Sequence, residues 1–191
     1  MAAMTTTPGR NHATDVALMR RVATHEPGAL EELIGLYQPR IRRLAFRLMA
    51  WRGEVDDVVQ EVLVTAFEKA AQYRGHASLW TWLTVITLNK SRTAMRRRAM
   101  RDRLASIFLA HTDQTTAPRS TAESDELTAQ VRSAVASLAP KDREVIILCH
   151  LEGKSPAEVG KLLGLSSNTA EVRLHRARKR LRDRLQDFMK E

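Results

Sequence analysis

The sequence has little of what stabilises exported or sheet-rich proteins. Its single cysteine, Cys149, excludes an intramolecular disulfide and is too few for a zinc site. Only 5% of the 191 residues are aromatic, so side chains that favour strands are scarce. No run approaches the roughly 20 apolar residues of a membrane span, and residues 1–14 lack the apolar core of a signal peptide. These absences predict a cytoplasmic, all-α protein.

What the sequence does contain is positive charge, placed unevenly. Lys and Arg total 31 against 22 for Asp and Glu, which gives a net charge of +9. This balance favours a polyanionic partner, either nucleic acid or an anionic membrane surface. Residues 90–103 and 173–184 each hold seven basic residues and one acid. Two such runs on separate helices indicate nucleic-acid binding rather than ordinary solvated faces.

Helical periodicity divides the chain into two parts. Apolar residues recur three and four apart between residues 15 and 103, and the Gly and Pro breaks predict helices over about 15–25, 28–51, 54–72 and 78–103. Residues 104–122, rich in Thr, Ser and Ala, predict a flexible linker, and residues 1–14 a flexible leader. Residues 123–191 contain four more short helices. The fold class is therefore all-α, with two small helical domains joined by a linker.

The second domain contains the pattern of a helix-turn-helix. Ser155 and Glu158 have the spacing of a capping box at the start of one helix. Gly160 is small where two helices must approach, and Gly164 allows the left-handed backbone of the turn. Ser166 or Ser167 then caps the second helix, with Leu165 in the core between the two.

That second helix is the candidate recognition helix. Its apolar residues are predicted to face inward: Val172, Leu174, Ala177, Leu181, Leu185 and Phe188. The polar residues near its N-terminus are left exposed, where a recognition helix reads base edges in the major groove: Asn168, Thr169, Glu171, Arg173, His175 and Arg176. Further along, Arg178, Lys179 and Arg182 are better placed for phosphates.

Residues 138–185 resemble the promoter-reading C-terminal domain of bacterial sigma factors of the extracytoplasmic-function (ECF) group. The shared pattern includes Arg143 to Val145, Leu151 to Gly153, Ser155 to Val159, Leu163 to Leu165 and Arg173 to Arg178. The resemblance implies a domain that reads the minus-thirty-five promoter element. The residues it implies at this element are Asn168, Thr169, Glu171, Arg173, His175, Arg176 and Lys179.

The first domain contains a helix with an acidic face. Asp57, Gln60 and Glu61 lie three and four residues apart and therefore share one side of it. Residues 56–75 with 79–98 resemble the second domain of the same sigma family, which implies that these three side chains contact core RNA polymerase. The resemblance also implies a pocket for a flipped base, made of Tyr73, Arg74, Gly75, His76, Ala77, Ser78 and Leu79. Adjacent bases and phosphates of the minus-ten element would then be held by Asn89, Arg92 and Arg96.

Physically, such a protein would assist strand separation by trapping an extruded base, without catalytic residues, metal, cofactor or small-molecule substrate. The implied partners are core RNA polymerase, promoter DNA and an anti-sigma factor. Two other functions stay open on the residues alone. One is a stand-alone helix-turn-helix regulator whose N-terminal half forms a dimerisation bundle. The other is a small metal- or phosphate-handling enzyme that uses the carboxylates near Asp57, against which no His partner accompanies them.

Overall fold

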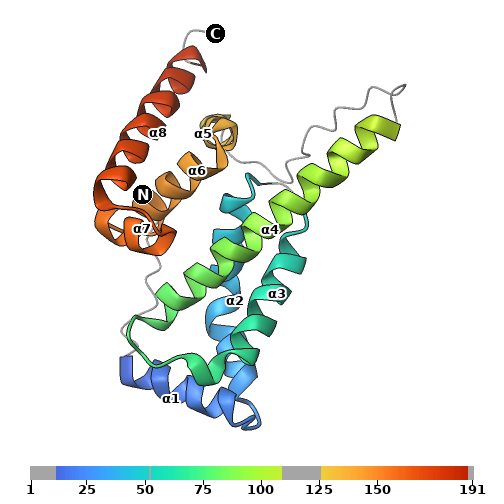
Figure 1. Cartoon of the computed structure of the whole chain (residues 1–191), viewed down its shortest axis with the longest axis vertical. Coiled ribbons are helices and arrows are strands. Elements are labelled where there is room, and N and C mark those ends of the chain that lie inside the picture. Colours follow the sequence, from blue (N-terminus) through green and yellow to red (C-terminus); the bar gives the residue numbers. More distant parts are fainter. Residues whose placement is uncertain (1–11, 52, 109–125, 189–191) are drawn as a thin grey trace. The chain divides into compact units, whose positions relative to one another are not determined.

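The computed structural model describes residues 12–51, 53–108 and 126–188, and this part of the chain is helical with no strand. Figure 1 shows the helices in chain order. They are α1 (His12–Ala23), α2 (Ala29–Leu48), α3 (Val55–Glu68), α4 (Leu79–Phe108), α5 (Glu126–Ser137), α6 (Pro140–Ile146), α7 (Pro156–Leu163) and α8 (Ser167–Phe188). A 3-10 turn, η1 (Ala70–Gln72), follows α3, and a π-helical turn, η2 (Ile147–Leu151), follows α6. The prediction of an all-α fold is confirmed.

These helices form two compact units. One contains the described residues up to Ala45 together with Glu54–Arg101, and the other contains Phe46–Gly53 and the described residues from Asp102 on. Each unit is small, so each depends on a core built from few helices.

The core of the first unit comes from one apolar face of each of its helices. The fully buried members include Leu18, Val22, Leu33, Ile41, Leu44, Val62, Leu83 and Leu88. One buried polar pair joins α1 to α2, because the Tyr37 hydroxyl donates to Asp15 Oδ1 at 3.0 Å. Trp80 is 7% exposed and lies under Arg40, whose guanidinium carbon is 4.0 Å from the ring centre. Trp80 therefore belongs to the core of this unit.

The second unit is organised around α8, which packs against α5, α6 and α7. Val145, Ile147 and Leu148 of α6 and η2 are fully buried beneath it. The Arg143 guanidinium is also buried and donates to the Ala136 carbonyl at 2.9 Å, which ties α6 to the end of α5. Apolar packing against α8 and the hydrogen bond from Arg143 therefore both hold α6 in place.

Two helices extend beyond their predicted boundaries, and two end earlier: α2 ends at Leu48 and α3 at Glu68, where η1 follows. Helix α4 continues to Phe108, because residues 104–108 contain neither Gly nor Pro and include good helix formers such as Leu104 and Ala105. The first five residues of the predicted linker, 104–108, are thus helical. The rest of it, 109–122, lies outside the described residues. Helix α1 begins at His12, inside the predicted leader.

Candidate nucleic-acid interface

The acidic face of α3 separates into two groups of side chains. Asp57 and Gln60 are exposed, as predicted for a docking surface. Glu61 is engaged within the protein: its carboxylate accepts from Arg97 at 3.0 Å and lies 3.4 Å from the Lys90 ammonium. Val64 of the same helix is 54% exposed although it is apolar. It lies four residues after Gln60 and therefore on the same side of α3.

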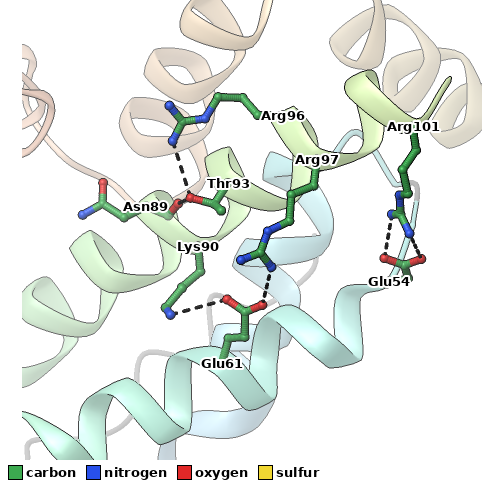
Figure 2. A network of polar contacts seen from close by, with 8 residues as sticks. All are labelled: Glu54, Glu61, Asn89, Lys90, Thr93, Arg96, Arg97 and Arg101. Atoms are coloured by element: carbon green, nitrogen blue, oxygen red, sulfur yellow. Dashed lines mark hydrogen bonds and ion pairs between the residues drawn. The ribbon is translucent and has the colours of Figure 1, made fainter. Parts of the chain in front are cut away.

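A second ion pair joins Glu54, the residue that precedes α3, to α4. The Arg101 guanidinium makes a bidentate contact with the Glu54 carboxylate, with nitrogen to oxygen distances of 3.2 and 3.0 Å. The hydrogen bonds from Arg101 and its positive charge lower the pKa of Glu54 below the ordinary carboxyl value. Figure 2 shows Glu54 and Glu61 facing Lys90, Arg97 and Arg101 along one side of α4.

The loop from Tyr73 to Leu79 is anchored at both ends. Tyr73 is 8% exposed and its hydroxyl donates to the Ala77 carbonyl at 2.8 Å, which closes the loop. Burial raises the pKa of Tyr73, so this phenol stays protonated and able to donate. Leu79 is fully buried at the start of α4. Tyr73 and Leu79 therefore hold the loop in place, while its exposed side chains lie between them: Arg74, His76, Ala77 and Ser78.

The middle of this loop lies tightly against α1. Gly75 has a φ of +76°, and a Cβ built there would lie 2.7 Å from Val16 Cγ2 and 2.9 Å from His12 Nε2. A glycine is thus required both for the backbone conformation and for the close approach. Ser78 then caps α4, because its hydroxyl accepts from the Thr81 N–H at 3.2 Å. The close packing of Gly75 and the Ser78 cap therefore fix the conformation of the loop.

Three predicted DNA contacts lie on α4 beyond this loop. Asn89 and Arg96 are exposed, and Arg92 is half-buried. In Figure 2, Asn89 and Arg96 point away from α3, on the other side of α4 from Lys90 and Arg97. Spacings of three and four residues place Asn89, Arg92 and Arg96 along one line of the helix.

The helix-turn-helix of the second unit has the predicted local structure. Ser155 Oγ accepts from the Glu158 N–H at 3.3 Å, and the Glu158 carboxylate accepts from the Ser155 N–H at 2.8 Å, which completes the capping box. Gly164 has a left-handed backbone with φ +68°. A Cβ on Gly160 would lie 3.0 Å from the Leu165 carbonyl oxygen, so the close approach of the turn is real. Leu165 itself is half-buried rather than fully in the core.

The reading face of α8 is close to the predicted one, with one correction. Its exposed residues include Asn168, Glu171, His175, Arg176 and Lys179, whereas Thr169 and Arg173 are half-buried. Val172 was expected to face inward and is instead 41% exposed.

The buried positions of α8 explain the error. They are Ala170, Leu174 and Ala177, at spacings of four and three. At 100° per residue, Val172 lies about 200° from Ala170, on the opposite side of the helix. The Phe188 side chain, also predicted to face inward, lies outside the described part.

The basic residues of α8 have few intramolecular partners. Arg180 pairs with Asp142 at 2.6 Å, and Arg178 donates to His150 Nε2 at 3.0 Å. Burial, with a smaller effect of the Arg178 charge, lowers the pKa of His150 and keeps this ring neutral as an acceptor. Within the described residues the other cations of the helix have no such partner: Arg173, Arg176, Lys179, Arg182 and Arg184.

The described residues show no sign of a metal centre or a membrane span. No group of three or more His, Cys, Asp or Glu side chains among them could hold a metal ion. None of the described helices is both long and apolar enough to cross a bilayer. Burial raises the pKa of the Cys149 thiol, which favours the protonated thiol over the thiolate.

Comparison with known proteins agrees with both halves of this geometry. Residues 33–101 match the family model described as Sigma-70 region 2, and residues 128–181 match the one described as Sigma-70, region 4. The chain is 32% identical over 159 residues to the ECF RNA polymerase sigma factor SigE of Mycolicibacterium smegmatis. That match covers 81% of this chain and 61% of the relative's length.

Two solved structures resemble the chain over most of its length. CnrH, solved in complex with the cytosolic domain of CnrY, is 30% identical with a TM-score of 0.64, over 91% of this chain and 97% of that one. The sigma factor RpoE, solved in complex with the anti-sigma factor NepR from Bartonella quintana, has a TM-score of 0.66 and covers 83% of this chain and 98% of that one. At 24% identity the second likeness concerns the fold alone.

Proposed function

This chain belongs to the ECF group of RNA polymerase sigma factors, proteins that direct RNA polymerase to promoters, and we propose how its residues divide that work. The first unit docks on core polymerase and captures the minus-ten element. The second unit reads the minus-thirty-five element. The observation that carries this division is that each unit presents a basic helix beside a distinct recognition feature, the anchored loop in one and the helix-turn-helix in the other.

Docking is assigned to the exposed side of α3. Asp57 and Gln60 provide polar contacts there, and the exposed Val64 provides an apolar one between them and the end of the helix. An acidic and partly apolar surface suits a partner with basic residues around an apolar centre. Glu61 borders this surface, although its carboxylate is held by α4 in the free protein.

Strand capture is assigned to the loop and the outer side of α4. Arg74, His76, Ala77 and Ser78 are exposed between two buried anchors, so they can meet a base without collapse of the loop. Asn89, Arg92 and Arg96 continue from the loop along α4 and suit adjacent bases and phosphates. Because separation of strands costs about 1.4 kcal/mol of stacking per step, binding of extruded bases and of the single strand offsets this cost.

Duplex reading is assigned to the N-terminal half of α8. Asn168 and Arg176 can make bidentate contacts with adenine and guanine, and Glu171 can accept from cytosine. The Glu171 carboxylate is within 3.4 Å of the Ser167 hydroxyl and stays exposed. Thr169 contributes less directly, because its hydroxyl shares a hydrogen bond of 2.8 Å with Ser166, the cap of the helix.

Location and regulation follow from the same proposal. RNA polymerase acts on chromosomal DNA, so we place the protein in the cytoplasm, and no step of the proposed function needs an active site. Two relatives of similar fold were solved with a bound partner, and the RpoE partner is an anti-sigma factor. An anti-sigma factor is the corresponding partner that we propose for this chain.

Transcription in vitro tests the proposal directly. The full chain is mixed with purified core RNA polymerase and a library of genomic fragments, and the expected result is initiation at a limited set of promoters that share two elements at fixed spacing. Gln60→Lys is expected to weaken binding to core, with Gln72→Lys, a position on η1 that is also exposed, as the matched control. Tight sequence-specific duplex binding without polymerase, and no initiation with it, would refute the assignment.

A further inference from the structure

The contacts between α3 and α4 link the two surfaces that the proposed function uses. Glu61 belongs to the edge of the docking surface, yet its carboxylate is held by Lys90 and Arg97 of α4, the helix whose other side carries the proposed DNA contacts Asn89 and Arg96. Glu54 holds Arg101 in the same way, one turn and more along α4. Glu61 of α3 and Glu54 at its N-cap therefore occupy cations that would otherwise add to the positive surface presented to nucleic acid (Figure 2).

These contacts are exchangeable. The Glu61 side chain is 37% exposed, and the side chains of Arg97 and Lys90 are 65% and 31% exposed. Exposed ion pairs contribute little net free energy, because water and salt compete with them. A phosphate can replace Glu61 beside Arg97, and a cation of another protein can replace Arg97 beside Glu61, at small cost in either direction.

We propose that Glu61 is a positioning residue that couples polymerase docking to DNA binding. In the free protein it holds Lys90 and Arg97 toward α3 and so lowers the affinity of α4 for nucleic acid. When a basic surface of polymerase binds α3 and takes over the Glu61 carboxylate, both cations become available for phosphates. The coupling rests on the proposed function, and because it is a binding equilibrium it is reciprocal: DNA bound to Lys90 and Arg97 frees Glu61 for polymerase.

The first experiment measures DNA binding of the full chain without polymerase. The probe is a fluorescently labelled oligodeoxythymidine, and the variants are Glu61→Gln and the matched control Glu68→Gln. Glu68 is exposed on the same helix and has no ion pair within the described residues. Both variants remove one negative charge from α3, but only Glu61→Gln releases Lys90 and Arg97.

Glu61→Gln is expected to bind the oligonucleotide more tightly than Glu68→Gln. Each cation that gains a phosphate adds about 0.7 to the slope of log affinity against log salt for a single strand, so two add up to about 1.4. This corresponds to a gain of up to about fivefold per cation at 0.1 M salt. The gain should shrink in an Arg97→Ala background. Equal affinities and slopes for the two variants would overturn the inference and leave the docking proposal standing.

The second experiment measures binding to core polymerase without DNA. Arg97→Ala removes one of the two cations that hold Glu61 and is expected to tighten this binding, whereas Arg103→Ala, an exposed arginine of α4 outside the network, is the control. Melting temperatures and helicity establish that all variants are folded. If the unaltered chain fails to bind core, the docking proposal falls and the coupling falls with it, whereas a wild-type affinity of Arg97→Ala overturns the coupling alone.

Discussion

Helices α4 and α8 have almost the same charge in sequence and a different electrostatic setting in the structure. Each includes a run of seven basic residues with a single acid. On α4, acids of a neighbouring helix hold Lys90, Arg97 and Arg101. On α8, Arg180 pairs with an acid and Arg178 contacts a neutral histidine, whereas Arg176 has no ion pair among the described residues.

The difference follows from what surrounds each helix. Helix α4 lies beside an acidic helix of its own unit, so part of its charge is neutralised within the protein. Helix α8 packs against α5, α6 and α7, and among the described residues one carboxylate, that of Asp142 on α6, pairs with a cation of α8. Charge counted along a sequence therefore overstates what α4 can offer to DNA and describes α8 well. The contacts of the two helices also differ. Ion pairs join α4 to Glu61 and Glu54, whereas α8 begins at a turn capped by Ser166.

The largest effect is expected for an arginine of α8. Arg176→Ala should weaken promoter binding by the polymerase complex by about 1–3 kcal/mol and relax specificity at one base pair, because its guanidinium is exposed and suits a bidentate base contact. Arg97→Ala, on the held side of α4, should cost less. Competition binding with single-base promoter variants measures both. A uniform loss over all sequences would assign Arg176 to a phosphate.

Removal of the cap on α7 is expected to have an intermediate effect. Ser155→Ala deletes the side chain that accepts from the Glu158 N–H, and should lower the free energy of unfolding by about 1 kcal/mol. Chemical denaturation followed by circular dichroism measures it. Ser106→Ala, near the end of α4 and outside this motif, is the comparison variant. Equal losses in the two variants would contradict a specific role of the cap.

Salt should distinguish the ion pairs of α4 from the cap. Glu54→Gln removes the contact with Arg101, so its melting temperature should fall below wild type at low salt, and the difference should shrink as salt screens the pair. Ser155→Ala should show a loss that is nearly independent of salt, because a cap is a local hydrogen bond. Parallel melting curves over a salt series make the comparison, and identical salt responses would contradict it.

The smallest effect concerns the histidine beside α8. The pKa of His150 is lowered in the folded protein by burial and by Arg178, so the unfolded chain binds a proton more readily. Stability from this group is therefore complete above its unfolded pKa of about 6.5 and falls as pH drops below it. Denaturation at neutral and mildly acidic pH should show a larger loss for wild type than for His150→Gln. Equal losses would mean that His150 does not titrate differently in the two states.

Local sequence determined the helices and the turn between α7 and α8. Apolar spacing, the Ser155 to Glu158 box and the positive φ of Gly164 depend on residues a few positions apart, so their patterns predict structure directly. The exposed Asp57, Gln60 and Arg176 could be predicted for the same reason, since helical geometry alone separates one face from another.

Tertiary structure alone decided which candidate side chains are available. Glu61 meets Arg97 from 36 residues away, and Tyr73 and Leu79 are buried as anchors of their loop by packing within the first unit. Val172 is exposed because the partners of α8 cover a stripe through Ala170 and Leu174, and a sequence shows apolar character without showing where the neighbours lie. Such contacts join residues distant in the chain, and their geometry depends on how whole helices pack.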